Sequence, residues 1–419
     1  MENAVHPKIV AGNFDVESIR ADFPVLFQKA YGKPLVYFDN AATSQKPQAV
    51  IDSLFQYYTT YNSNIHRGVH FLSQKASQAF DDVRVKVRDF IHAKSAAEII
   101  FVRGTTEGIN LIASTFGKIV IGAGDEVLIT AMEHHSNIVP WQMLCEEKGA
   151  SLKVVPMNDK GELLMDEFHR LLNPKVKLIS IVHTSNSLGT INPLKEIITK
   201  AHSLNIPVVV DAAQSVVHST VNVQELDCDF LTFSAHKMLG PTGIGIVYGK
   251  SKHLNAMPPY QGGGEMIHSV SFEKTTYNEI PYKFEAGTPN IADVIAFGTA
   301  IDYLNKMDRT SALNHEKALT IYATEQLCKI PGLRLIGTAA EKAAVLSFVI
   351  DGCNAFDVGM YLDTLGIAVR TGHHCTEPVM TRFNIPGTIR ASFLFYNTFS
   401  EIDSLVNGIQ KAIQLLRGK

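Results

Sequence analysis

The sequence has little of what would mark a secreted, membrane or nucleic-acid-binding protein. Its five cysteines are scattered and form no CxxC pair, which argues against a disulfide framework and against a metal site of the zinc type. No apolar run approaches membrane-spanning length, and residues 1–15 lack the basic segment and apolar run of a secretory signal. A net charge of -3 offers no basic surface to a nucleic acid. We therefore expect a cytoplasmic protein that binds neither membrane nor nucleic acid.

What the sequence does have is a regular alternation of apolar strands and amphipathic helices. Strand-like runs include Glu98–Val102, Glu126–Thr130, Val176–His183 and Pro207–Asp211, each followed by a helical pattern or a turn. This spacing predicts a mostly parallel sheet covered by helices on both faces. We predict an α/β fold in which a large domain holds a mostly parallel seven-stranded sheet, joined to a smaller C-terminal α+β domain.

The chain is long enough for more than one domain. Residues 1–24 are predicted to be an N-terminal segment that packs with the small domain. Residues 25–308 form the predicted large domain and residues 309–419 the small one. The pattern loosens over Met257–Thr288, a stretch rich in glycine and polar residues that we expect to wrap over a site.

One lysine stands between two runs that read as core strands. The run Asp229–Ser234 leads into Ser234-Ala-His-Lys237, and a glycine-rich turn leads into the second run, Ile244–Tyr248. Lysine is almost never buried without a partner or a purpose. One hypothesis is that Lys237 forms a Schiff base with a carbonyl cofactor. The alternative is a lysine at a strand end that reaches out to solvent.

Further polar motifs follow the predicted strands, at the end of the sheet where ligands bind in such folds. The stretch Gly104-Thr-Thr-Glu-Gly108 suits a phosphate at a helix N-terminus, or is an ordinary helix cap. Within Glu133-His-His-Ser-Asn137 a histidine ring could face a cofactor ring, or simply satisfy local hydrogen bonds. Asp211 could pair with a protonated pyridine nitrogen, or cap a helix. The sequence contains no nucleotide-binding fingerprint.

The predicted small domain carries two more candidates. In Arg370-Thr-Gly-His-His-Cys375, a cysteine beside histidines and near an arginine is a candidate reactive thiol. Arg390 could hold a substrate carboxylate through its planar guanidinium group, or form a surface ion pair. Together these motifs describe one site: a lysine, an aspartate for a ring nitrogen, a phosphate cradle, an arginine for a carboxylate, and a thiol.

With those residues assembled, nearly the whole chain closely resembles the group II (SufS-type) cysteine desulfurases, which are enzymes of the aspartate-aminotransferase-like class that use pyridoxal 5'-phosphate (PLP). The residues that carry the resemblance are Phe38-Asp-Asn-Ala-Ala, Asn64-Ile-His-Arg-Gly-Val-His70, Gly104-Thr-Thr-Glu-Gly-Ile-Asn110, Glu133-His-His-Ser-Asn-Ile-Val-Pro-Trp-Gln142, Asp211-Ala-Ala-Gln214, Ser234-Ala-His-Lys237, Gly262-Gly-Gly-Glu-Met266, Phe284-Glu-Ala-Gly-Thr-Pro-Asn290 and Arg370-Thr-Gly-His-His-Cys375. The last motif is the most specific, because Ser-x-His-Lys alone would indicate only a PLP enzyme.

The resemblance implies a role for each matching residue. Lys237 holds PLP, His134 stacks on its ring, Asp211 pairs with the ring nitrogen and Gln214 contacts the phenolic oxygen. The residues implied to bind the cofactor phosphate are Thr105, Thr106, Ser234 and His236, with Thr288 from the partner subunit of a homodimer. The residues implied to bind or flank the substrate are Asn186, Arg390, Arg370, His66 and Arg67.

The implied reaction converts L-cysteine to L-alanine. Its sulfur passes to Cys375 as a persulfide, and then to a SufE- or SufU-like acceptor protein for Fe–S cluster assembly. The chain departs from the family after this cysteine, where it has Cys375-Thr-Glu-Pro378 in place of Cys-Ala-Gln-Pro. Glu377 adds a negative charge that disfavours a thiolate. The alternatives are a selenocysteine lyase, another PLP-dependent aminotransferase-like enzyme, or a non-catalytic paralogue that binds an assembly partner.

Overall fold

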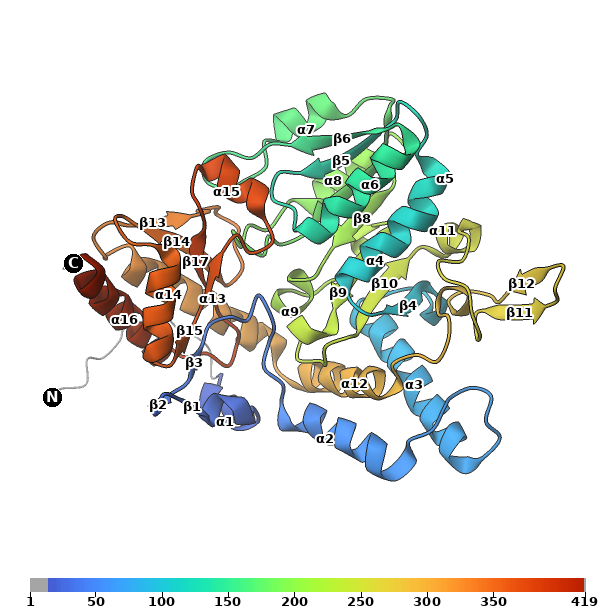
Figure 1. The fold of residues 1–419 in the computed structure, drawn as a ribbon, viewed down its shortest axis with the longest axis horizontal. Coiled ribbons are helices and arrows are strands. Elements are labelled where there is room, and N and C mark those ends of the chain that lie inside the picture. The colour runs from blue at the N-terminus through green and yellow to red at the C-terminus, as the bar shows by residue number, and fades with distance from the viewer. Residues whose placement is uncertain (1–13, 418–419) are drawn as a thin grey trace.

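The computed structural model describes residues 14–417, and a seven-stranded sheet lies at its centre (Figure 1). Strand β10 runs antiparallel between β4 and β9, and the other strands are parallel to one another. In spatial order the strands are β4 (Ile99–Val102), β10 (Gly245–Gly249), β9 (Phe230–Ser234), β8 (Val208–Asp211), β7 (Val176–Val182), β5 (Glu126–Thr130) and β6 (Ser151–Val155). The predicted α/β fold with a mostly parallel seven-stranded sheet is confirmed.

The side chains of this sheet point alternately into two hydrophobic cores, because successive residues of a strand face opposite sides. In β4, Ile99 and Phe101 belong to one core, whereas Ile100 and Val102 belong to the other. The first core is covered by α3 (Phe71–Phe90), α8 (Leu194–His202) and α12 (Ile291–Lys306), and the second by α4 (Thr105–Ile112) and α6 (Val139–Lys148). Because helices cover both faces, a ligand approaches this sheet at the ends of its strands.

Other helices complete this part of the chain. They are α2 (Gln48–Gln56), α5 (Lys118–Val120), α7 (Met165–Leu171), α9 (Ser215–His218), α10 (Val223–Leu226) and α11 (Ser251–Ala256). Among the described residues, no helix is both long enough and apolar enough to span a bilayer.

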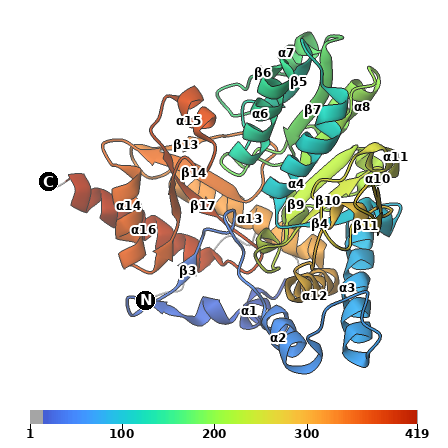
Figure 2. The same cartoon turned by 45° about the vertical axis from the view of Figure 1, so that its right-hand side comes forward.

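A second, antiparallel sheet lies beside the first and has its own hydrophobic core (Figures 1 and 2). Its strands are, in order, β13 (Leu333–Ile336), β14 (Val345–Ile350), β17 (Thr388–Ser392) and β16 (Arg370–Gly372). The helices around it are α13 (Arg309–Leu327), α14 (Ala355–Thr364), α15 (Glu377–Phe383) and α16 (Phe399–Arg417). Asp308 lies between α12 and α13 and caps α13 by accepting a hydrogen bond from the Ser311 backbone N–H (3.1 Å). We propose that the large and small domains meet at this residue.

The N-terminal part of the described chain contacts this second unit. Arg20, in α1 (Val16–Ala21), forms an ion pair with Glu401 of α16 (3.0 Å) and donates to the Tyr396 carbonyl (2.6 Å). Further along, β3 (Val36–Tyr37) pairs in parallel with β15 (Ile367–Ala368). The contacts of Arg20 support our proposal that the N-terminal segment, residues 1–24, packs with the small domain. Strand β3 lies beyond that segment, among the residues proposed for the large domain, yet pairs with a strand of the small one. Residues 1–13 of the N-terminal segment lie outside the described part of the chain.

The short elements that the sequence did not predict include strands β11 (Ile267–Val270) and β12 (Thr275–Tyr277) and helix α15. Within Met257–Thr288, the two strands form a hairpin that projects from the body of the molecule (Figure 1). Its side chains are mostly exposed, so no buried stripe marks it in the sequence. Helix α15 begins two residues after Cys375, and it has only two buried side chains, Val379 and Met380.

Candidate active site

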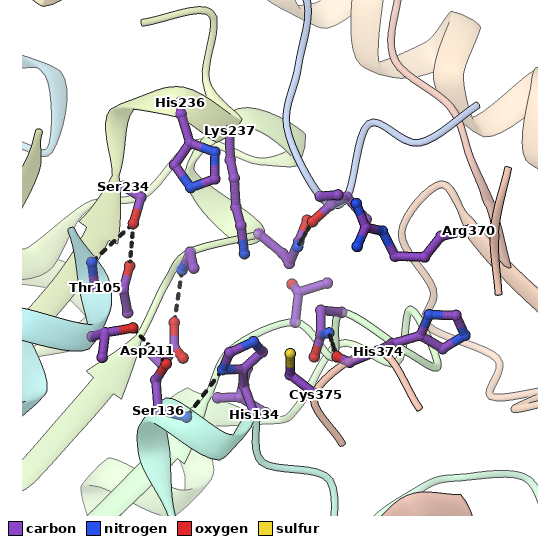
Figure 3. Close-up of a pocket in the computed structure, with 18 of the residues that line it drawn as sticks. Thr105, His134, Ser136, Asp211, Ser234, His236, Lys237, Arg370, His374 and Cys375 are labelled. Carbon is purple, nitrogen blue, oxygen red and sulfur yellow. Dashed lines mark hydrogen bonds between the residues drawn. The ribbon is translucent and has the colours of Figure 1, made fainter. Parts of the chain in front are cut away.

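A cavity of about 290 Å³ lies at the carboxyl ends of strands β5, β7, β8 and β9, where the small domain faces them (Figure 3). Segments from both proposed domains line it. The residues predicted from the sequence that it brings together are Thr105, Thr106, His134, Asn186, Asp211, Gln214, Ser234, His236, Lys237, Arg370, Cys375 and Arg390. Twelve of the fifteen predicted site residues therefore meet around one cavity of one chain.

Lys237 follows β9 on the short 3-10 turn Ala235–Lys237 and extends its amine into the cavity (Figure 3). The carbonyl of His236 anchors this turn by accepting a hydrogen bond from Nζ of Lys46 (2.9 Å). Burial lowers the pKa of Lys237 to about 8, and the negative charge of Asp211 opposes that shift. Near neutral pH more of this amine is therefore uncharged than in an exposed lysine. The uncharged amine is the form that attacks a carbonyl group.

Asp211 is a buried carboxyl group at the carboxyl end of β8. One of its oxygens accepts a hydrogen bond from the Ala213 N–H (2.9 Å). Burial raises the pKa of Asp211, while this hydrogen bond and the charge of Lys237 lower it. The cap residue of the following helix α9 is Gln214, not Asp211. A buried carboxylate in this position needs a cation beside it, and a protonated ring nitrogen would supply one.

His134 places a neutral ring at the cavity. Its Nδ1 accepts a hydrogen bond from the Ser136 N–H (3.0 Å), so the ring proton is on Nε2. Burial, followed by the charge of Lys237, lowers the pKa of His134 to about 3. Behind it, the buried carboxyl of Glu133 accepts hydrogen bonds from Asn137 (2.7 Å) and from the backbone of β7. The segment that carries the ring is therefore held by the core of the large domain.

Hydroxyl groups and backbone N–H groups converge at the start of α4. Thr105 donates its N–H to Oγ of Ser234 (2.9 Å), and its hydroxyl contacts the same atom (2.9 Å). The hydroxyls of Thr106 and Ser136 share a hydrogen bond (2.6 Å). The first N–H groups of a helix lack intrahelical partners, and together with these hydroxyls they suit a phosphate. Ser136 was not predicted individually, although it lies inside the quoted histidine motif.

Two arginines from the small domain share one carboxylate. Arg390 in β17 is only 2% exposed, and its guanidinium donates to the Asn186 carbonyl (3.0 Å) and to Asp39 (3.1 Å). Arg370 donates to the same carboxylate (2.8 Å). Burial lowers the pKa of Arg390 to about 10, and Asp39 opposes that shift. Among the described residues, Nε of Arg390 and Oδ1 of Asn186 are buried polar atoms without a hydrogen-bond partner.

Asp39 was not predicted as a site residue. The available signal was a carboxylate directly after the short strand-like run Leu35–Phe38, which is the same pattern that singled out Asp211. Its two arginine partners lie 331 and 351 residues further along the chain. No local pattern could have paired them.

Cys375 lies on the small-domain side of the cavity, which His134 also lines (Figure 3). The residue is exposed. Both His374 and Cys375 adopt left-handed backbone conformations, with φ of 54° and 57°. The side chain of Asn186 donates to the His374 carbonyl (2.7 Å), which ties this turn to the loop after β7.

Three predicted site residues lie away from this cavity in the same chain. His66 lines a different cavity, together with Glu265. Arg67 forms an ion pair with that same glutamate (2.9 Å). Thr288 lines a third cavity. The sequence-based prediction placed Thr288 in a partner subunit, but it made no such assignment for His66 and Arg67.

Comparison with known proteins places this arrangement in a family. Residues 36–405 match the Aminotransferase class-V family. The chain belongs to this family.

Three similar proteins refine the placement of this class-V chain. It is 50% identical to a cysteine desulfurase of Synechococcus elongatus over 96% of its own length, but spans only 64% of that relative. It is 48% identical to a cysteine desulfurase of Enterobacter sp., over 96% of this chain and the whole of the relative. The crystal structure of the Escherichia coli cysteine desulfurase CsdA superposes with a TM-score of 0.90 and 38% identity, covering 96% of this chain and all of that one.

Proposed function

We propose that this protein is a PLP-dependent cysteine desulfurase that converts L-cysteine to L-alanine and takes up the sulfur as a persulfide on Cys375. One observation carries the proposal: Lys237 of the large domain and Cys375 of the small domain line the same cavity, with Asp211 and His134 beside them. A lysine for the Schiff base and a partner for the pyridine nitrogen, here an aspartate, are common to PLP enzymes. The thiol facing them selects sulfur chemistry. The motif Arg370–Cys375 further supports the group II, SufS-type subclass.

The cavity fits PLP by the chemistry of its residues. Lys237 supplies an amine of lowered pKa, Asp211 a buried carboxyl group for the ring nitrogen, and His134 a neutral ring to stack on the pyridine. Gln214 lines the same cavity and is assigned to the phenolic oxygen. The residues assigned to the phosphate are Thr105, Thr106, Ser234 and His236. When bound, the cofactor withdraws electrons from the substrate and makes its Cα proton acidic.

The substrate carboxylate is assigned to Arg390 and Asn186. Arg390 is the better anchor because its guanidinium is buried and its Nε lacks a partner within the described chain. A carboxylate oxygen accepting from Nε would satisfy that donor, and buried donors are costly when left unpaired. The Asp39 carboxylate cancels one of the two arginine charges nearby. The remaining positive charge matches a substrate with a single free carboxylate.

The chemical steps follow from two side chains. The Nζ of Lys237 removes the Cα proton of L-cysteine and holds it for return to the product. The Cys375 thiolate attacks the substrate sulfur, so that an S–S bond forms and the substrate C–S bond breaks. The electron pair of that bond stays on the substrate carbon, which is protonated and leaves as L-alanine. In the proposed next step, the persulfide sulfur passes to a SufE- or SufU-like acceptor for Fe–S cluster assembly.

The first test is an assay of the purified, PLP-loaded protein with L-cysteine. We expect alanine in the product and a Cys375 peptide that gains the mass of one sulfur atom. Dependence of turnover on a 2-oxo acid would show an aminotransferase instead, and a strong preference for L-selenocysteine would show a selenocysteine lyase. If none of these substrates is turned over, the remaining alternative is a non-catalytic paralogue that binds an assembly partner.

We further propose a homodimer in which the partner contributes Thr288, His66 and Arg67. Large apolar side chains are exposed on α2, on α3 and on the loop between them, including Phe55 (72%), Val69 (91%) and Phe71 (73%). Exposed apolar side chains in such numbers mark an association surface.

Light scattering is therefore expected to give twice the mass of one chain. A Phe71→Asp variant is expected to dissociate and to lose activity, because a charge would be buried at the interface. A monomer of full activity would contradict the proposal.

A further inference from the structure

His135 contacts the backbone on both sides of the thiol. Its own N–H donates to the carbonyl of Cys375 (2.8 Å). Its ring atom Nε2 accepts a hydrogen bond from the N–H of Glu377 (3.1 Å). These bonds join the segment after β5 in the large domain to the nucleophile segment of the small domain, across 242 residues of sequence.

The second of these bonds caps a helix from outside. Helix α15 begins at Glu377, and its N-cap residue Thr376 makes no side-chain capping bond. The N–H groups of a first helical turn need partners from elsewhere. The His135 ring gives Glu377 that partner, and so fixes where the helix begins, two residues after Cys375.

The turn that carries the thiol needs support, because its backbone is in an unfavourable region. His374 and Cys375 are consecutive non-glycine residues with positive φ, which persist only where surrounding contacts determine them. On one side, the Asn186 side chain holds the His374 carbonyl (2.7 Å), and the His374 ring contacts Thr388 Oγ1 (2.7 Å). On the other side, His135 bonds to the Cys375 carbonyl and to the Glu377 N–H.

Hydrogen bonds of the neighbouring residues fix the position of His135. Glu133, two residues earlier, accepts hydrogen bonds from the Val182 N–H (3.0 Å) and from the side chain of Asn137 (2.7 Å). Asn137 in turn accepts from the buried Trp141 indole (2.9 Å). The position of His135 is therefore set by the core of the large domain, which also carries the cofactor site.

We propose that His135 is a positioning residue for the nucleophile. It holds the left-handed turn at Cys375 so that the sulfur faces the substrate, and its ring must be neutral, with the proton on Nδ1, to accept from Glu377. This inference rests on the proposed function, because it gives Cys375 the role of nucleophile. A residue that merely stabilised the fold would have no selective effect on persulfide formation.

The test compares His135→Gln with His135→Asn in the PLP-loaded enzyme. Glutamine can place its amide oxygen near the position of Nε2, whereas asparagine reaches only as far as Nδ1. We expect the Asn variant to keep the cofactor absorption and the KM for L-cysteine. It should form the Cys375 persulfide about 10- to 100-fold more slowly, as expected when a reacting atom moves by about 1 Å. The Gln variant should recover most of that rate.

Equal rates in the wild type and the Asn variant would overturn the inference. Equal losses of rate in the Asn and Gln variants would also overturn it. So would a loss of cofactor absorption that parallels the loss of rate. Either result would indicate a purely structural role for His135. The midpoint temperature of thermal unfolding is measured for each variant as well, to report the contribution of the helix cap to stability. If the wild type itself forms no persulfide on Cys375, the proposed function fails. If the wild type forms it and the Asn variant does so equally fast, only the role of His135 fails.

Discussion

A Lys237→Ala protein is expected to lose L-cysteine turnover by at least about 10²- to 10⁴-fold, because the group that moves the Cα proton is gone. The same variant should also be unable to attach PLP covalently. Borohydride reduction of the wild type is expected to leave the cofactor on the peptide that contains Lys237, and reduction of the variant to leave none. Turnover near the wild-type rate would refute the assignment of this lysine. Lys252, whose side chain is 67% exposed, offers a matched control, and Lys252→Ala should retain activity.

The lowered pKa of Lys237 adds a pH dependence to this prediction. The uncharged amine is the reactive form, and it accumulates as the pH rises through the pKa of about 8. The rate at which the cofactor-free protein takes up PLP should therefore rise between neutral pH and about pH 9, and then level off. An ordinary exposed lysine would continue to gain reactivity up to a pKa of about 10.4. Rapid-mixing absorbance measurements across this range distinguish the two cases.

A Cys375→Ser protein is expected to bind PLP normally and to form no persulfide. Alanine formation should fall by about 10³-fold or more, as when a catalytic nucleophile is removed from other enzymes. A serine hydroxyl is a much weaker nucleophile than a thiol at neutral pH. Cofactor absorption, and the spectral change on adding L-cysteine, report the earlier steps and should remain. Persulfide labelling of this variant at the level of the wild type would show that another residue accepts the sulfur.

A second exposed thiol provides the control. Cys328 is exposed at the end of α13, outside the cavity, and Cys328→Ser should keep both alanine formation and persulfide labelling. Mixing the Lys237→Ala and Cys375→Ser proteins gives a further check. Because both residues line the cavity of one chain, hybrid dimers should regain no activity. Recovery would show that the two residues of a working site come from different subunits.

Much of the fold was predictable because it depends on local patterns. The strand predicted over Glu126–Thr130 has those bounds in the structure, and the strand predicted over Glu98–Val102 begins one residue later. Apolar periodicity gives this information wherever one face of an element is buried. It failed at β11 and β12, whose residues are mostly exposed, and at β16 (Arg370–Gly372), which is a strand only because β17 pairs with it.

The site was predictable to a similar degree and for a different reason. In an open α/β sheet, the carboxyl ends of the strands meet at one edge, so motifs after strands such as Asp211 and Ser234 could be expected to converge. Asp39 and His135 were missed. Their partners, Arg390 for one and the Glu377 N–H for the other, belong to the small domain. The packing of two domains against each other leaves no periodic signal in the sequence of either domain.

By itself, the sequence determined which chemical groups are available: a lysine after a buried strand, an aspartate at a strand end, and a cysteine in a motif with histidines and arginine. Only the tertiary structure decided that these groups face one another and how reactive they are. Burial between the domains lowers the pKa of Lys237 to about 8. Hydrogen bonds from Asn186 and His135 hold the turn at Cys375. Both effects arise from desolvation and from contacts between distant segments, which exist only after the two domains have packed together.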